Sequence, residues 1–181
     1  MDTPSLTNDD KLLSEAVVKA TTSVFESMIG IDVEFLCSEE SKAATMNSEV
    51  VSLISFTGNY IGTLSTFFNA ETALKAASGM LGMECASIDE DVQDVIGEIT
   101  NMVAGNVKTS MEKVYGGLHL SIPIVICGKS LSVSSTGGAS TQEQGATSSV
   151  SFANKESWLL SRFKMDVGTF TIGMLVKKVG N

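Results

Sequence analysis

Five polar or small residues recur along one helical stripe in the middle of the sequence. Glu98 and Asn101 stand three positions apart, so their side chains are neighbours on one surface of a helix. Asp94 lies one turn before Glu98, and Gly105 and Lys108 continue the stripe beyond Asn101. A carboxylate beside a carboxamide offers recognition through charge and hydrogen bonds, and no base, nucleophile or metal-ligand cluster accompanies it. The same pattern is typical of a solvated helix face, so both interpretations stay open.

The helix that must position these side chains spans residues 89–114. At about 100° per residue, the five polar or small residues lie opposite a broad apolar face centred on Val92. A glycine within a helix costs about 1 kcal/mol relative to alanine. Gly105 removes a side chain where a second surface would have to approach, and Gly97 interrupts the helix beside the stripe, although either glycine could equally serve packing. The predicted buried face consists of Val92, Val95, Ile96, Ile99, Met102, Val103, Val107 and Val114.

The remaining elements follow from hydrophobic period and turn residues. The chain is predicted to begin with a loose tail over residues 1–9 and a helix from about residue 10 to Met28, which Gly30 stops. A strand over 31–37 and a polar loop over 38–48 follow. Strands over 50–56 and 61–68, joined by a turn, then lead to a helix over 70–81 closed by Gly82. After the long helix we predict a strand over 118–127 containing Pro123, a flexible Ser/Gly/Thr-rich loop over 129–147, and a meander of strands over 148–154, 158–165 and 169–177.

This order predicts an α+β fold with a mostly antiparallel sheet and long helices packed on it. A helix followed by strands occurs twice, which suggests two related halves. Residues 10–181 then form a single domain, which suits the length of 181 residues.

Composition excludes several function classes. There are 12 basic against 21 acidic residues, and Arg162 is the only arginine, so a nucleic-acid surface is not expected. His119 is the only histidine, which leaves little for a histidine-rich metal site or a catalytic triad. His119 and Ser121 lie on one face of a strand, but an acid partner for a hydrolase is not visible.

Cysteine usage and the N-terminus indicate a compartment. Cys37, Cys85 and Cys127 include no CxxC pair, so we expect three reduced, buried thiols. The N-terminus is acidic and polar, unlike a signal peptide, and no apolar run is long enough to cross a bilayer. The sequence therefore predicts a cytoplasmic protein without membrane association.

The stretch DVQDVIGEITNMVAGNVK, followed by LHLSIPIVICG, resembles the CheX branch of the CheC/CheX/FliY phosphatases of bacterial chemotaxis. The residues that carry the resemblance are Asp94, Glu98 and Asn101 in one helix and Pro123 in the next strand. ISFTGNYIGTLSTFF, MLGMEC and MIGIDVEF extend it over about residues 12–177. Two features differ from other members of the family. The 129–147 loop is longer than expected, and the first helix lacks a second Glu-x-x-Asn site.

The resemblance implies a phosphatase that hydrolyses the aspartyl phosphate of a CheY-like response regulator. It implies that Asn101 orients the attacking water and that Glu98 pairs with the regulator's active-site lysine. Asp94, Gly105 and Lys108 would then contact the same partner, and Mg²⁺ would come with the regulator rather than bind to this chain. Relatives form homodimers through strands of the sheet, for which the closing strands near Phe170 and Ile172 are candidates. The alternative is an adapter that binds the regulator without hydrolysing its phosphate.

Overall fold

The computed structural model describes residues 8–41, 43–134, 149–151 and 157–179. The helical elements are α1 (Asn8–Val24), the π-helical segment η1 (Phe25–Ile29), α2 (Ala70–Leu81) and α3 (Glu90–Tyr115). The strands are β1 (Glu34–Ser41), β2 (Ala43–Gly58), β3 (Tyr60–Phe68), β4 (Leu118–Leu120), β5 (Ile124–Ser134), β6 (Ser149–Ser151), β7 (Trp158–Met165) and β8 (Gly168–Lys178).

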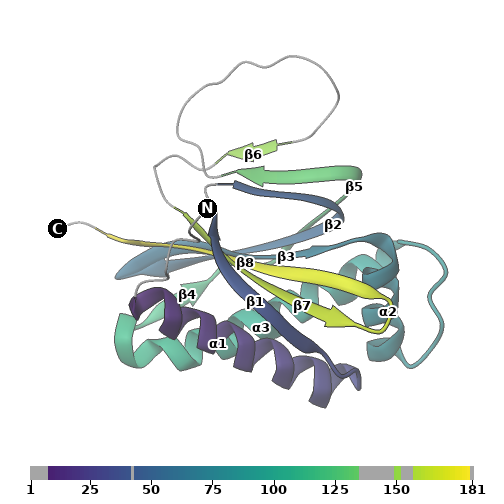
Figure 1. The fold of residues 1–181 in the computed structure, drawn as a ribbon, viewed down its shortest axis with the longest axis horizontal. Helices are drawn as coiled ribbons and strands as arrows, with labels where there is room; N and C mark the ends of the chain where they lie inside the picture. The colour runs from purple at the N-terminus through teal and green to yellow at the C-terminus, as the bar shows by residue number, and fades with distance from the viewer. Residues whose placement is uncertain (1–7, 42, 135–148, 152–156, 180–181) are drawn as a thin grey trace.

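The strands form one sheet in the order β1-β7-β8-β3-β2-β5-β6, with β4 also pairing with β2. All pairs are antiparallel except β5 with β6. The three α-helices lie on one side of the sheet (Figure 1). The predicted α+β fold is confirmed.

The strand order supports the expectation of two related halves. Each half has a long helix, α1 or α3, followed by a strand, β1 or β5, and a hairpin, β2–β3 or β7–β8. The counterparts in the two halves are β1 and β5, β2 and β7, and β3 and β8. When each strand in the order β1-β7-β8-β3-β2-β5 is replaced by its counterpart, the result is the same order starting from the other end. The hairpins meet at the centre where β3 pairs with β8, and α1 and α3 are therefore equivalent helices.

Apolar side chains are buried on both faces of the sheet. The larger core lies between the helices and the sheet, and three stacked aromatic pairs join Phe25, Phe68, Phe163 and Phe170 within it. The smaller core includes Trp158 and lies on the other face, where Leu131 and Val133 from the far half of β5 are also buried. Trp158 is fully buried in this smaller core.

Local signals predicted several elements well. The helix over 70–81 is α2, and its N-cap Asn69 accepts a hydrogen bond from the Thr72 N–H. Gly30 and Gly82 end their helices in the left-handed conformation, as expected for glycine. The hairpin is formed by β2 and β3, and the predicted strand over 158–165 is β7.

Two predictions in the first half are wrong. The strand predicted over 31–37 begins only at Glu34, and much of the polar loop predicted over 38–48 is strand. β1 is an edge strand paired with β7, so its polar side chains can face water while its backbone is hydrogen-bonded. Residues 1–7 of the predicted tail lie outside the described residues, and the helix begins at Asn8, inside that tail.

The strand predicted over 118–127 is interrupted at Pro123, which has no N–H to donate. β4 and β5 both pair with β2. The three residues that connect β4 to β5, 121–123, lie opposite only two residues of β2, 54–55, which makes a bulge. At this bulge the Ser121 N–H donates to the Ser55 carbonyl at 2.8 Å, and the Ser121 hydroxyl accepts from the Ser55 N–H at 3.0 Å. Ser121 is therefore engaged in hydrogen bonds with the backbone of β2, one of which uses its hydroxyl. This weakens the interpretation of His119 and Ser121 as a catalytic pair of a serine hydrolase.

The closing strands do not form the predicted meander. β6 pairs in parallel with β5 at the opposite end of the sheet from β7, and only β7 and β8 form a hairpin. β5 extends to Ser134, into the predicted 129–147 loop, while residues 135–148 and 152–156 lie outside the described residues. Phe170 and Ile172 are buried on β8, which is paired on both edges, so they cannot form a dimer edge as predicted.

The cysteines are free thiols, but Cys37 and Cys127 are exposed rather than buried as predicted. Both lie on strands near the edges of the sheet, where one strand face is open to solvent. Partial burial raises the pKa of the Cys127 thiol. None of the described helices is long and apolar enough to cross a membrane.

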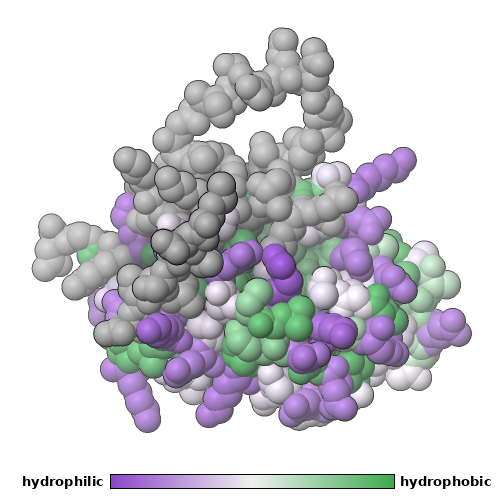
Figure 2. Space-filling model, viewed as in Figure 1, coloured by the Kyte–Doolittle hydropathy of each residue, from purple (hydrophilic) through white to green (hydrophobic). Residues whose placement is uncertain are grey.

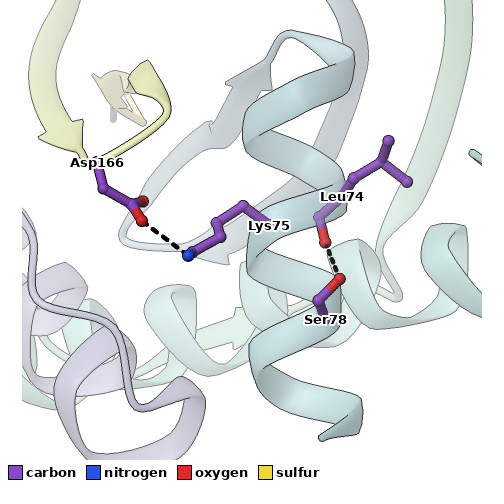
Figure 3. Close-up of polar contacts among 4 residues, drawn as sticks. All are labelled: Leu74, Lys75, Ser78 and Asp166. Atoms are coloured by element: carbon purple, nitrogen blue, oxygen red, sulfur yellow. Dashed lines mark hydrogen bonds and ion pairs between the residues drawn. The ribbon is translucent and has the colours of Figure 1, made fainter. Parts of the chain in front are cut away.

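An ion pair fastens α2 to the β7–β8 turn (Figure 3). Lys75 Nζ lies 2.7 Å from a carboxylate oxygen of Asp166, and this hydrogen bond lowers the pKa of that carboxyl. In the same view the Ser78 hydroxyl donates to the Leu74 carbonyl. Outside the view, the Ser78 hydroxyl also accepts a hydrogen bond from the Cys85 N–H. The Lys75–Asp166 and Ser78–Cys85 contacts thus connect α2 to the β7–β8 turn and to the segment that follows α2.

Candidate functional site

The predicted stripe lies on α3, the longest helix in the described part of the chain. Asp89 is its N-cap and accepts a hydrogen bond from the Val92 N–H at 3.1 Å, and Glu90 and Asp91 follow in the first turn. Gly116 ends the helix with a φ of 76°. The helix is therefore well bounded, and it presents a rigid surface rather than a loop.

Most of the predicted apolar face is buried against the sheet. Five residues of that face are at most 2% exposed: Val92, Ile96, Ile99, Val103 and Val107. Met102, which was predicted on the same face, is only partly buried, whereas Met111 is fully buried. The prediction that Val114 is buried is wrong, because its side chain is 54% exposed in the last turn of the helix.

The structure places the predicted site residues together on the outward side of α3. Asp94 and Glu98 are exposed, and Asn101, Gly105 and Lys108 are half-buried. The spacing puts the side chains of Glu98 and Asn101 about 5–6 Å apart at their Cβ atoms. Their placement on one solvent-facing surface agrees with the sequence prediction.

The two glycines of α3 have different surroundings. A Cβ added at Gly105 would meet nothing within 4 Å, so this position is open to an approaching surface. Gly97 is buried, and a Cβ there would lie 3.4 Å from Val125 and 3.7 Å from Pro123. Gly97 is therefore packed beside the bulge before β5, at ordinary contact distances for a methyl group, and is not a second opening in the stripe.

We expect Gly105→Ala to raise the free energy of unfolding by about 0.5–1 kcal/mol, because alanine is the better helix former and its methyl group meets open space. Denaturant unfolding measures this change. Gly97→Ala is the matched comparison: its Cβ would lie 3.4 Å from Val125 and 3.7 Å from Pro123, which are ordinary contact distances, so its stability gain should be at least as large. A destabilised Gly105→Ala variant would contradict the open position.

Within the part of the chain that the structure describes, Lys108 differs from the other residues of the stripe in having an ion-pair partner. Its Nζ lies 3.5 Å from a carboxylate oxygen of Glu112, one turn further along α3. Such an exposed i, i+4 pair contributes about 0.3–0.5 kcal/mol. A negatively charged partner could therefore compete for Lys108 at small cost.

The equivalent helix α1 carries no comparable pair. Glu15 is exposed, but the residue three positions later is Val18, which packs partly against the core. This agrees with the single site expected from the sequence.

The cavity found beneath this part of α3 is too small for a substrate. The apolar cavity beneath the second half of α3, reached by Ala104, Lys108 and Met111 among others, holds about 20 Å³, which is room for one water molecule. Among the described residues, no group of three His, Cys, Asp or Glu side chains is placed to hold a metal ion. The side chains of the stripe lie on the outer surface of α3, where a partner protein can reach them.

Comparison with known proteins identifies the family and the fold of this chain. A family profile described as chemotaxis phosphatase CheX matches residues 50–145, which contain the whole of α3. The chain belongs to the CheX family. A curated CheX relative, the CheY-P phosphatase CheX of Thermotoga maritima, is 29% identical over 129 residues, covering 71% of this chain and 83% of the relative.

Solved structures share the fold of this CheX-family chain. A CheC-like superfamily protein from Shewanella sp. PV-4 has a TM-score of 0.76 at 23% identity, covering 94% of this chain and 99% of that protein. The chemotaxis protein CheX from Desulfovibrio desulfuricans also has a TM-score of 0.76, at 24% identity, covering 91% and 99%. A CheX–CheY–BeF₃–Mg²⁺ complex from Borrelia burgdorferi matches with a TM-score of 0.67 at 18% identity, covering 90% and 96%.

Proposed function

We propose that this chain accelerates hydrolysis of the aspartyl phosphate of a CheY-like response regulator. In this proposal Asn101 enters the regulator's active site and its carboxamide orients the attacking water. Glu98 pairs with the regulator's active-site lysine and fixes the docked geometry, while Asp94, Gly105 and Lys108 contact the regulator around them. The observation that carries the proposal is the outward placement of Glu98 and Asn101 on one rigid helix beside an open glycine.

The chemistry suits a surface site of this kind. Phosphoryl transfer to water depends mainly on positioning and on stabilisation of charge, and an amide can orient a water without changing its own protonation. The side chains on α3 supply an amide and a carboxylate, and the regulator would supply the phosphorylated aspartate and the lysine. A covalent intermediate on this chain is not required.

Magnesium belongs to the partner in this proposal. Mg²⁺ prefers oxygen ligands and often binds through carboxylates together with phosphate oxygens, an arrangement that the regulator's own active site would provide. The Borrelia burgdorferi complex contains CheX, CheY, BeF₃ and Mg²⁺ together. The curated Thermotoga maritima relative carries the name CheY-P phosphatase, which supports the same reaction class.

A phosphate-release assay separates this proposal from the adapter alternative. Phosphorylated regulators are incubated with and without the chain, and the lifetime of the phosphate is compared with binding measured in parallel. We expect the lifetime to shorten with substoichiometric amounts of the chain. Binding with an unchanged phosphate lifetime would favour the adapter.

We also propose that the chain forms a homodimer, and that it does so through β1 in place of the closing strands. In the described part of the sheet, β1 pairs only with β7, so its outer edge is free. Phe35 and Leu36 on β1 are 39% and 42% exposed, and Figure 2 shows apolar surface among hydrophilic side chains over this strand. An edge with exposed apolar residues is suited to pairing with a second copy.

Light scattering tests the homodimer, with an expected mass of twice the 19.1 kDa of one chain. Leu36→Lys should convert the dimer to monomer, because a lysine on an edge strand opposes pairing. Leu81→Lys on α2 is the control, since Leu81 has the same exposed fraction of 42%. A dimer that survives Leu36→Lys would exclude this edge.

A further inference from the structure

Among the described residues, α3 is held to the sheet by apolar packing and by a buried polar contact. The hydroxyls of Thr66 on β3 and Thr100 on α3 lie 2.9 Å apart, and both side chains are fully buried. Apolar contacts are non-directional, so they alone would tolerate small rotations of α3 about its axis. A hydrogen bond has a preferred length and angle, and it can hold the helix in one orientation.

The direction of this hydrogen bond follows from the donors available. The Thr100 hydroxyl donates to the carbonyl of Ile96, one turn earlier, at 2.8 Å. A hydroxyl has one proton to donate, so in the Thr66–Thr100 contact Thr66 is the donor and Thr100 the acceptor. The Thr100 side chain is thus held both to its own helix and to the central strand β3.

Thr100 lies directly before Asn101 and two residues after Glu98. Its side chain points into the protein, and theirs point outward, on the same turn of α3. The tip of a side chain on a helix lies about 5–6 Å from the axis, so a rotation of roughly 10° moves it by about 1 Å. A misplacement of that size can reduce a reaction that depends on positioning by about 100-fold.

We propose that Thr66 and Thr100 are positioning residues, whose hydrogen bond sets the rotation of α3 and thereby places Asn101 and Glu98 for the reaction. This inference rests on the proposed phosphatase function. It assigns a role to two buried hydroxyls that touch neither the regulator nor the phosphate. Thr66 is suited to this role because β3 lies near the centre of the sheet, paired with β2 on one side and β8 on the other.

The test replaces Thr100 by valine, which keeps the shape of the side chain and removes its hydroxyl. Phosphate release is measured at saturating and at limiting concentrations of phosphorylated regulator, well below the melting temperature. We expect kcat to fall about tenfold, with a smaller change in the half-saturation concentration. Thr100→Ser keeps the hydroxyl and should retain kcat within about twofold.

Thr21→Val is the matched control. Thr21 lies on α1, the helix equivalent to α3, and is also fully buried, but its hydroxyl has no hydrogen-bond partner in the described part of the chain. Loss of this hydroxyl should leave kcat unchanged. If kcat falls equally in Thr21→Val and Thr100→Val, the loss comes from removing any buried hydroxyl. That result would overturn the positioning role.

Thr66→Val breaks the same hydrogen bond from the side of the sheet, which provides a second variant if Thr100→Val does not fold. The two substitutions should not be additive, so the double variant should have about the kcat of either single one. Wild-type kcat in Thr66→Val or Thr100→Val, with Asn101→Ala inactive, would overturn the positioning role alone. A wild-type chain that does not accelerate phosphate loss would overturn the proposed function and the positioning role together.

Discussion

Replacing Asn101 by alanine should abolish the accelerated loss of phosphate and leave binding of the regulator largely intact. The substitution removes the carboxamide that is proposed to orient water, but it leaves the docking carboxylate of Glu98 in place. Because Asn101 lies on the outward side of α3 and is only half-buried, its truncation should not disturb the apolar core. We expect the catalysed rate at saturation to fall by at least about 100-fold, as is typical when a positioned polar group is removed from a hydrolytic site.

The experiment measures single-turnover decay of a phosphorylated regulator together with binding affinity. Asn106→Ala is the control, since Asn106 is an exposed asparagine on the same helix outside the stripe. Its rate should match that of the wild type. The proposed mechanism is wrong if Asn101→Ala still dephosphorylates at the wild-type rate.

Reversing the charge of Glu98 should mainly weaken docking. Glu98→Lys removes the carboxylate that is proposed to pair with the regulator's lysine and places two cations opposite each other. Loss of a charged partner at an interface commonly costs about 2–5 kcal/mol, so the half-saturation concentration should rise about 30-fold or more. Glu98→Ala should have a smaller effect in the same direction, because it removes the attraction without adding repulsion.

Glu15→Lys is the matched control for this prediction. Glu15 is exposed at the corresponding place on the equivalent helix α1, and its substitution changes the net charge of the chain by the same amount. If the chain's net charge of −9 were the cause, both variants would alter docking equally. We expect only Glu98→Lys to raise the half-saturation concentration, and equal effects would contradict a specific ion pair.

Local sequence signals predicted those elements whose ends depend on nearby residues. Asn69 and Gly82 cap the two ends of α2, and Asp89 is the N-cap of α3, because cap residues satisfy backbone groups within a few positions of themselves. The amphipathic pattern of α3 predicted which side is buried, and with it the grouping of Glu98 and Asn101. The prediction was wrong for Val114, because the pattern does not show where the helix extends past the sheet.

The arrangement of the sheet depended on contacts between distant residues. Ser38–Ser41 are polar and were predicted as loop, yet they are strand because β7, more than 100 residues later in the chain, pairs with them. The order that buries Phe170 and, in the described part of the sheet, pairs β1 on one side only likewise results from long-range pairing. Hydrophobic period within a segment carries no information on its neighbours in a sheet.

The sequence by itself therefore determined the composition of the candidate site and the helix that carries it, because residues three and four apart become neighbours on any α-helix. Only the tertiary structure decided how that helix is held. It distinguished the open Gly105 from the packed Gly97, and it brought the Thr66 hydroxyl to Thr100 across a separation of 34 residues. The physical reason is that packing against the sheet and a buried hydrogen bond need two surfaces, and the sequence of one helix describes only one of them.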